Sequence, residues 1–328
     1  MEEFRMIEFQ QTRDFSRKLN ATFEFVRQNF KQLGKSILFI AGPPVLVGSV
    51  MAGSFIGEFF NLGISAQSNP EVFSNYFLSV SFWTQLLLMF VFLTVSFVVA
   101  IATINCYLII YDQKKSNHIE VSEVWDRVRL AFWPYLGSTI LFFILFITVY
   151  IILLIPIFVF ANISGVLVFF GAVLVVFGLI FLVFSSSLTY FIQLYEKKNF
   201  FDAINRSIRL VNNGKWWSTF GLIMVLYLIM MTVSYIFIIP YYVVLFTNTL
   251  HSVSTGTVVE PSSGWKIWTV VFFTLYYMAQ MLMYALPNIG IAFQYFNLVE
   301  LKEAKGLMNQ IENLGQPTPT SNRPEEHF

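Results

Sequence analysis

The sequence predicts an all-α integral membrane protein with six transmembrane helices arranged in three hairpins, on two observations. First, its 328 residues are 56% hydrophobic and only 12% charged, about half the charged fraction usual in soluble domains, and the mean hydropathy is +0.67. Second, six long apolar stretches contain almost none of the charged residues. Soluble, disordered and nucleic-acid-binding classes are excluded, because so much apolar surface needs lipid around it.

Each apolar stretch offers the roughly 20 residues that an α-helix needs to cross ~30 Å of hydrocarbon. The stretches lack the alternation of barrel strands, so helices are the only spanning structure that satisfies the backbone in lipid. Glu58, near the outer end of the first stretch, is the only charge well inside a span. The predicted spans are Ser36 to Phe60, Phe82 to Tyr111, Phe132 to Phe160, Val166 to Tyr195, Trp217 to Phe246 and Ile267 to Tyr295.

The distribution of Lys and Arg predicts the orientation. Of the 20 basic residues, 19 lie on one side of the predicted membrane, and only Lys266 lies in the opposite loops. The positive-inside rule therefore places both termini in the cytoplasm and the protein in the cytoplasmic membrane. We expect no signal peptide, because residues 1–35 are charged and contain no apolar segment of the kind that signal peptides carry.

A short amphipathic stretch precedes each predicted hairpin. We expect these stretches, residues 1–35, 119–132 and 199–213, to form helices that lie at the cytoplasmic interface. A fourth follows the last span at 301–315, and the polar tail 316–328 is expected to be disordered. The apolar positions recur every three or four residues and are Phe15, Leu19, Phe23, Val26, Phe30 and Leu33, then Val121, Trp125, Val128 and Phe132, then Phe200, Ile204, Ile208 and Val211.

Matching positions along the domain 36–300 indicate an internal repeat. Gly137 and Pro156 are nineteen residues apart, as are Gly221 and Pro240. Tyr111-Asp112-Gln113-Lys114-Lys115 follows the second span, and Tyr195-Glu196-Lys197-Lys198 follows the fourth. We predict a tandem unit of interface helix, span, outer loop and span. The alternative is that any six-span protein with short cytoplasmic loops has basic, amphipathic connectors.

One segment carries a resemblance to a known family. Residues 203–211, Ala-Ile-Asn-Arg-Ser-Ile-Arg-Leu-Val, are followed by Gly214-Lys215-Trp216-Trp217 ahead of a span. The segment resembles one in bacterial six-span proteins of the glycerophosphoryl diester phosphodiesterase membrane-domain family and its uncharacterised relatives. The resemblance implies amphipathic helices alternating with membrane hairpins. The enzymatic part of that family label belongs to a separate barrel of about 250 residues, so the resemblance does not imply an enzyme.

Basic and aromatic residues at the predicted interface are candidate sites for lipid headgroups. Cations there attract anionic lipids, and Trp is typical of the interfacial belt. The alternative is that these residues only anchor a hairpin. The candidates are Arg206, Arg209, Lys215, Trp216 and Trp217 in the third unit, and Trp125, Arg127 and Arg129, with Trp133, in the second.

A break is predicted in the last span, at Ala285-Leu286-Pro287-Asn288-Ile289-Gly290. Proline removes a backbone donor, and the freed carbonyls are able to line a cavity. Together with Gly42-Pro43-Pro44, the residues Pro287, Asn288 and Gly290 predict a polar pocket between the first and last helices. The alternative is an ordinary proline kink.

No catalytic, cofactor or metal site is expected. The three histidines, His118, His251 and His327, are isolated, and Cys106 is the only cysteine. Ser185-Ser186-Ser187 matches no nucleophile motif, and small hydroxyls in a span more often let helices approach closely. Uncharged polar residues in or beside the spans are expected to hydrogen-bond between helices; they are Gln85, Asn105, Gln193, Gln280, Asn288 and Gln294.

The sequence therefore leads to a non-enzymatic membrane protein that interacts with lipids or helps to assemble and maintain a complex in the cell envelope. Its expected partners are membrane lipids, possible anionic headgroups among them, other membrane proteins or a second copy, and not nucleic acid. The alternative is a carrier or channel-like protein for a small or lipidic solute. A carrier needs a continuous polar cavity bounded by the breaks at Pro43 and Pro287.

Overall fold

The computed structural model describes residues 6–68, 71–161, 163–243, 246, 247, 250, 263–304 and 308. In that part of the chain the structure is all-helical, and six helices are long and apolar enough to cross a membrane. The predicted multi-pass membrane architecture is confirmed at this level. The elements are α1 (Phe15–Ser36), a π-helical turn η1 (Ile37–Ala41), α2 (Gly42–Ser68), α3 (Glu71–Leu78), α4 (Val80–Lys114), α5 (Val121–Ala161), α6 (Gly165–Ser185), α7 (Thr189–Tyr195), α8 (Phe200–Asn212), α9 (Trp216–Tyr235), α11 (Ser263–Met283) and α12 (Ala285–Glu303).

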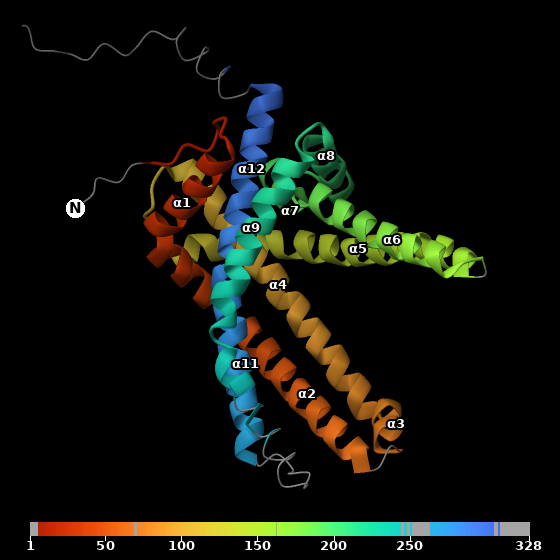
Figure 1. The fold of residues 1–328 in the computed structure, drawn as a ribbon. Helices are drawn as coiled ribbons and strands as arrows, with labels where there is room; N and C mark the ends of the chain where they lie inside the picture. The colour runs from red at the N-terminus through yellow and green to blue at the C-terminus, as the bar shows by residue number, and fades with distance from the viewer. Residues whose placement is uncertain are drawn as a thin grey trace, which may run out of the picture.

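The long helices spread out from one packed end of the molecule (Figure 1). There α1, α8 and the adjoining ends of α4, α5, α7 and α12 come together, and we call this region the basic end because it contains the basic connecting segments. From it, α2 runs beside α4 and α11, whereas α9 lies against α11 and α12. The paired helices α5 and α6 point in a different direction from the others (Figure 1).

An aromatic core fills the basic end. Phe9, which precedes α1, stacks on Phe296 with ring centroids 5.1 Å apart and also contacts Phe25 of α1. The backbone N–H of Ile7 donates to the hydroxyl of Tyr111 on α4. The segment before α1 is therefore packed into the protein, although the sequence shows it only as a charged stretch. Such aromatic contacts add to the stabilisation that burial provides.

Helix α1 buries only part of the apolar stripe that its sequence suggests. Large apolar side chains of that stripe, Phe15, Phe23 and Phe30, are exposed on the surface. The face packed against the protein instead carries Lys18, Thr22, Phe25, Asn29 and Leu33. Because lipid is as apolar as these Phe side chains, a membrane protein gains little from turning them inward. The packed face is mixed, and its polar residues as well as Phe25 and Leu33 find partners inside the protein.

The second predicted interface helix is not a separate element. Helix α5 runs without interruption from Val121 to Ala161, so residues 119–132 and the third span belong to one helix of 41 residues. At 1.5 Å per residue it is about 60 Å long, roughly twice the thickness of the hydrocarbon. The expected boundary near Phe132 is absent, and Pro134 is accommodated inside the helix. Residues 121–132 are helical as part of α5, and an interface helix there stays a prediction.

The fourth span is broken by its serines. Helix α6 ends at Ser185 and α7 begins at Thr189. The hydroxyls of Ser186 and Ser187 donate back to the carbonyls of Leu182 and Phe184. Ser207 of α8 closes the break, because its hydroxyl donates to the carbonyl of Ser185 and accepts from the N–H of Leu188. These serines satisfy an interrupted backbone, which the sequence analysis did not anticipate.

Prolines mark the other interruptions. In the last span α11 ends at Met283 and α12 begins at Ala285; Pro287 lacks the N–H that would bond to the carbonyl of Met283. Helix α9 ends at Tyr235, ahead of Pro240, whereas the predicted span continued to 246. The π-helical turn η1 lies directly before Pro43 and Pro44, where two successive N–H donors are missing.

The ends of α4, α7 and α12 share a backbone feature. Lys115, Lys197 and Ala304 have φ angles of 53°, 53° and 45°, the left-handed conformation in which helices commonly end. This supports the internal repeat, which stays a prediction. Of the predicted C-terminal helix 301–315, the structure describes the end of α12, Ala304 and Met308. The tail 316–328 and most of the loop 247–266 lie outside the described residues.

The close approach of α12 to α9 at Gly290 generates a prediction. A Cβ added at Gly290 would lie 2.1 Å from Cδ1 of Leu226, a fully buried side chain. We expect Gly290→Ala to lower the free energy of unfolding by about 1–3 kcal/mol through overpacking, measured as a lower midpoint of thermal unfolding in mild detergent.

The matched control is Gly137→Ala on α5, because nothing lies within 4 Å of the position that its Cβ would take. Alanine favours a helix interior more than glycine does, so this variant should keep or raise the midpoint. Equal stability of the two variants would show that α9 and α12 are not in close contact at Gly290.

Candidate functional site

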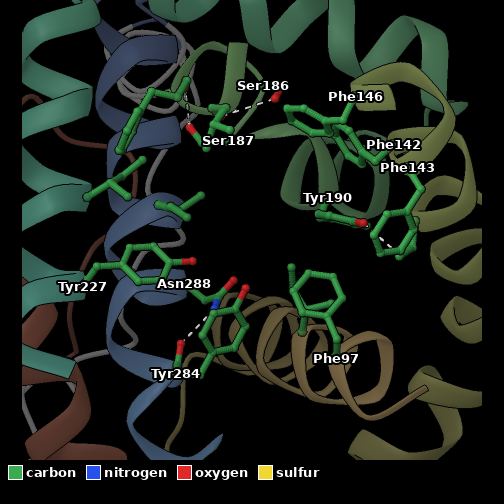
Figure 2. A pocket seen from close by; sticks show the side chains of 16 residues that line it. Phe97, Phe142, Phe143, Phe146, Ser186, Ser187, Tyr190, Tyr227, Tyr284 and Asn288 are labelled. Carbon is green, nitrogen blue, oxygen red and sulfur yellow. Dashed lines mark hydrogen bonds between the residues drawn. The ribbon is translucent and has the colours of Figure 1, made fainter. Parts of the chain in front are cut away.

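A cavity of about 340 Å³ lies between the α5 and α6 pair and the neighbouring helices α4, α9 and α12. Figure 2 shows Tyr284 and Asn288 on one side of it and Phe142, Phe143 and Tyr190 on the other. Its walls come from α4, α5, α6, α7, α9 and α12. The lining residues are Phe97, Ile101, Thr139, Phe142, Phe143, Phe146, Val183, Phe184, Ser186, Ser187, Tyr190, Ile223, Tyr227, Tyr284, Asn288 and Ile291. We call this space the apolar cavity.

The lining of the apolar cavity is aromatic and uncharged. No Asp, Glu, Lys, Arg or His is among the lining residues. Its polar groups largely bond to the protein itself: the hydroxyls of Thr139 and Tyr190 are 2.8 Å apart, and Nδ2 of Asn288 donates to the carbonyl of Tyr284. A cavity with this chemistry suits an uncharged, mainly apolar group that fills space against rings.

Two helix breaks border the same cavity. Ser186 and Ser187 belong to the break between α6 and α7, and Tyr284 is the residue between α11 and α12 (Figure 2). Interrupted helices at membrane depth occur where they are buried in protein or line a cavity, and discontinuous spans commonly form the binding sites of membrane transporters. The two breaks thus coincide with the apolar cavity.

The residues of the predicted break have different positions. Asn288 lines the apolar cavity, whereas Gly290 faces Leu226 and Thr22 instead. Pro287 is buried in α12 but does not line the cavity, and neither Pro43 nor Pro44 does so. The cavity is therefore formed by the last helix together with α4, α5, α6, α7 and α9, and not between the first and last helices as the sequence suggested.

Arg206, a predicted headgroup ligand, lies in an internal ion-pair network. Its guanidinium pairs with Glu196 through Nε and with Glu303 through Nη2 at 2.9 Å. The Tyr295 hydroxyl donates to the same oxygen of Glu196 at 2.7 Å, and Lys198 lies 3.0 Å from the other. The Arg206 side chain is only 17% exposed. This network joins α8, α12 and the end of α7.

The network changes the acidity of Glu196. Burial opposes ionisation of this carboxyl, but hydrogen bonds from Tyr295, Lys198 and Arg206 outweigh that effect and lower its pKa. A carboxyl with a lowered pKa in the folded state stabilises the fold above its ordinary pKa, and this contribution is lost as the pH falls through the lowered value. Arg206 is thus held inside the basic end by two carboxylates, and its role as a headgroup ligand stays a prediction.

The other predicted headgroup residues lie mainly on the surface. Arg209 and Lys215 are exposed, and Trp217 is 76% exposed. Trp216 is stacked against Phe220 and Phe181. In the second unit Trp125 and Trp133 are exposed, and Arg129 is paired with Asp126 at 2.5 Å. Arg127 is half-buried and hydrogen-bonds to Gln113.

Lys18 is a functional candidate that the sequence analysis missed. Although charged, it is 1% exposed, and its Nζ donates to Oε1 of Gln294 at 2.6 Å and to Ser218 at 3.0 Å. Burial, reinforced by nearby Lys215, lowers its pKa to about 8. Only its place on the hydrophilic side of α1 was visible in the sequence, and spacing alone does not show which polar residue is buried.

Within the described part of the chain, no group of three or more His, Cys, Asp or Glu side chains is placed to hold a metal ion. In comparisons with known proteins, no family model, curated protein or solved structure matches this chain.

The different surroundings of Arg206 and Arg209 generate a prediction. We expect Arg206→Gln to lower the free energy of unfolding by about 1–3 kcal/mol, because it removes charged hydrogen bonds from two half-buried carboxylates. Arg209→Gln, on the same helix and exposed, should change it by less than about 0.5 kcal/mol. Thermal unfolding in detergent distinguishes the two, and equal midpoints would mean that the network does not stabilise the fold.

Proposed function

We propose that this chain is a lipid-binding protein of the cytoplasmic membrane, which holds an apolar chain, such as an acyl chain, in the apolar cavity. The observation that carries the proposal is the uncharged aromatic cavity between diverging spans, bordered by two helix breaks. Its volume lies in the range of known ligand sites. An apolar chain is the ligand that such a lining accommodates without leaving a charge unpaired.

The surroundings of the cavity support a lipid as the ligand. Val183 and Phe143 line the cavity and are also exposed on the surface of the protein, which in a membrane is contacted by lipid. A lipid tail is therefore able to enter from the bilayer without crossing water. Exposed Trp133 and Trp217, together with Arg209 and Lys215, lie near the basic end, where they support contacts with lipid headgroups.

The α5 and α6 pair supports interaction with another membrane component. In the most apolar part of α5 no residue is buried inside the protein, and in α6 the buried share is 11%. Spanning helices with so few contacts are surrounded by lipid or by a partner, and a partner would fit the role in assembling a complex that the sequence suggests.

The second candidate function is a carrier for a lipidic solute, favoured by the two helix breaks at the cavity. Measuring the transfer of fluorescent lipid between the leaflets of reconstituted vesicles separates the two functions. A protein that only binds lipid leaves this rate unchanged, whereas a carrier raises it.

The proposed orientation is testable by cysteine labelling. The basic residues predict that both termini and the basic end lie in the cytoplasm. In intact cells a cysteine at Ser252 should react with a membrane-impermeant reagent, and one at Ser321 should not; both positions lie outside the described residues. Cys106 is buried in α4 and should not contribute. Reversed labelling would contradict the orientation.

Filling the cavity tests the proposed function. Val183 on α6 lines the cavity and is also exposed, so Val183→Trp should put a ring into the ligand space with little effect on folding. We expect the lipid retained after purification in mild detergent to bind about tenfold more weakly, equivalent to ~1.4 kcal/mol. Native mass spectrometry measures the retained lipid.

Val176→Trp is the matched control, because Val176 lies two turns away on α6, is also exposed and does not line the cavity. Its lipid content should equal that of the unmodified protein. Equal lipid retention in both variants would show that the cavity does not hold the lipid.

A further inference from the structure

A second cavity, of about 730 Å³, lies at the basic end between the end of α4, the start of α5 and the segment that follows α7. One side of it is polar and contains Gln113, Arg127, Gln193, Lys197 and Lys198, with Asp112 beside them. The other side is apolar and includes Leu130 and Pro134 of α5. We call this space the interfacial cavity. It is distinct from the apolar cavity, because the two share none of their lining residues.

Arg127 gives the interfacial cavity a positive charge that no carboxylate of the described residues pairs with. The half-buried guanidinium of Arg127 hydrogen-bonds to the neutral side chain of Gln113. In the described part of the chain, no carboxylate is within ion-pair distance of it. The nearby Glu123 is bonded to Lys114 at 2.5 Å. A half-buried cation at a cavity without a carboxylate partner is a favourable ligand for an anion.

The other charged residues that line the interfacial cavity are Lys197, Lys198 and Asp112. Lys198 is paired with Glu196, and Asp112 is paired with Lys115 at 2.7 Å, so both of these charges are offset. Lys197 is exposed and forms no ion pair with any described residue. The cations without a carboxylate partner at the cavity are therefore Arg127 and Lys197, one from each side of the space between α5 and α7.

The position of the cavity on α5 indicates the level of the lipid headgroups. Leu130 and Trp133 follow Arg127 on this helix and are 80% and 72% exposed. Tryptophan is enriched at the boundary between headgroups and hydrocarbon, so the apolar wall faces lipid and the cationic wall faces the aqueous side. Phosphate groups of phospholipids lie at this boundary, and guanidinium groups bind phosphate oxygens through paired hydrogen bonds.

We propose that the interfacial cavity is a binding site for the phosphate group of a phosphate ester, with Arg127 and Lys197 as its ligands. An anionic phospholipid headgroup and a soluble phosphate ester offer the same chemistry, and the apolar wall formed by Leu130 and Pro134 adds a surface for the glycerol and first methylenes of a lipid. The proposal is independent of the apolar cavity, because the phosphate binds here whether or not a chain is held there.

The test is a titration of the full-length protein in a neutral detergent. Three probes distinguish the sources of phosphate: dioctanoyl phosphatidic acid, glycerol 3-phosphate, and dioctanoylglycerol, which lacks phosphate. Binding is read from tryptophan fluorescence, since Trp125 and Trp133 flank Arg127 on α5, and from the shift in the midpoint of thermal unfolding. We expect phosphatidic acid to bind and dioctanoylglycerol to bind at least about tenfold more weakly.

Three variants assign the site. Arg127→Gln and Lys197→Gln should each weaken binding of the phosphate-bearing probe about tenfold. Arg129→Gln, two residues along α5, removes an exposed cation that is paired with Asp126 and does not line the cavity, and it should bind within about twofold of the unmodified protein. Lys197 is exposed, so its variant keeps the test valid should Arg127→Gln fail to fold.

Each outcome decides the proposal. Binding of phosphatidic acid but not glycerol 3-phosphate assigns the site to a lipid headgroup, and equal binding of both assigns it to a soluble ester. Equal binding of dioctanoylglycerol and phosphatidic acid, or equal losses in the Arg127 and Arg129 variants, would overturn the phosphate site. Dioctanoylglycerol carries the same chains without the phosphate, so the difference in binding between the two lipids is separate from the result for the apolar cavity.

Discussion

The structure depends on one constraint: a backbone N–H or carbonyl in apolar surroundings must find a partner. Along α5 and α6, which stand apart from the other helices, both helices continue without interruption. The break between α6 and α7 lies close to the packed basic end, where Ser207 of α8 satisfies the carbonyl of Ser185 and the N–H of Leu188. The breaks are thus restricted to a few places, and two of them border the apolar cavity.

Polar contacts act together with the aromatic core at the basic end, while Phe23 and Phe30 of α1 face outward. Lys18 bonds to Gln294, and the hydroxyl of Tyr107 donates to Asn29 at 3.0 Å. In water, burying such groups in place of Phe23 or Phe30 would be unfavourable. In lipid an exposed aromatic ring costs little free energy. A polar group there is stabilised when it hydrogen-bonds to another polar group inside the protein. The same logic explains why Arg206 is paired internally while Trp217 is exposed.

The two cavities are separated by a pair of tyrosines on neighbouring helices. The hydroxyl of Tyr135, which lines the interfacial cavity, donates to the backbone carbonyl of Tyr190 at 2.6 Å, and Tyr190 lines the apolar cavity. Thr139, one turn beyond Tyr135 on α5, also lines the apolar cavity, about 6 Å further along the helix axis. The cationic interfacial cavity and the uncharged apolar cavity therefore lie one after the other along α5.

The sequence by itself determined the environment and the number of spans, because the length and apolarity of a helix needed in a bilayer are local properties. It also located the interruption near Pro287, since a missing N–H is a property of one residue. Only the tertiary structure decided which faces are buried: Lys18 and Asn29 turn inward on α1, Arg206 is neutralised by Glu196 and Glu303, and α5 joins an expected interface helix to a span. It also decided that Asn288 lines a cavity with α4, α5 and α6. These outcomes depend on contacts with residues distant in the chain. In addition, the hydrophobic pattern of a helix in lipid does not select which face is buried, because the protein interior and the surrounding lipid are both apolar.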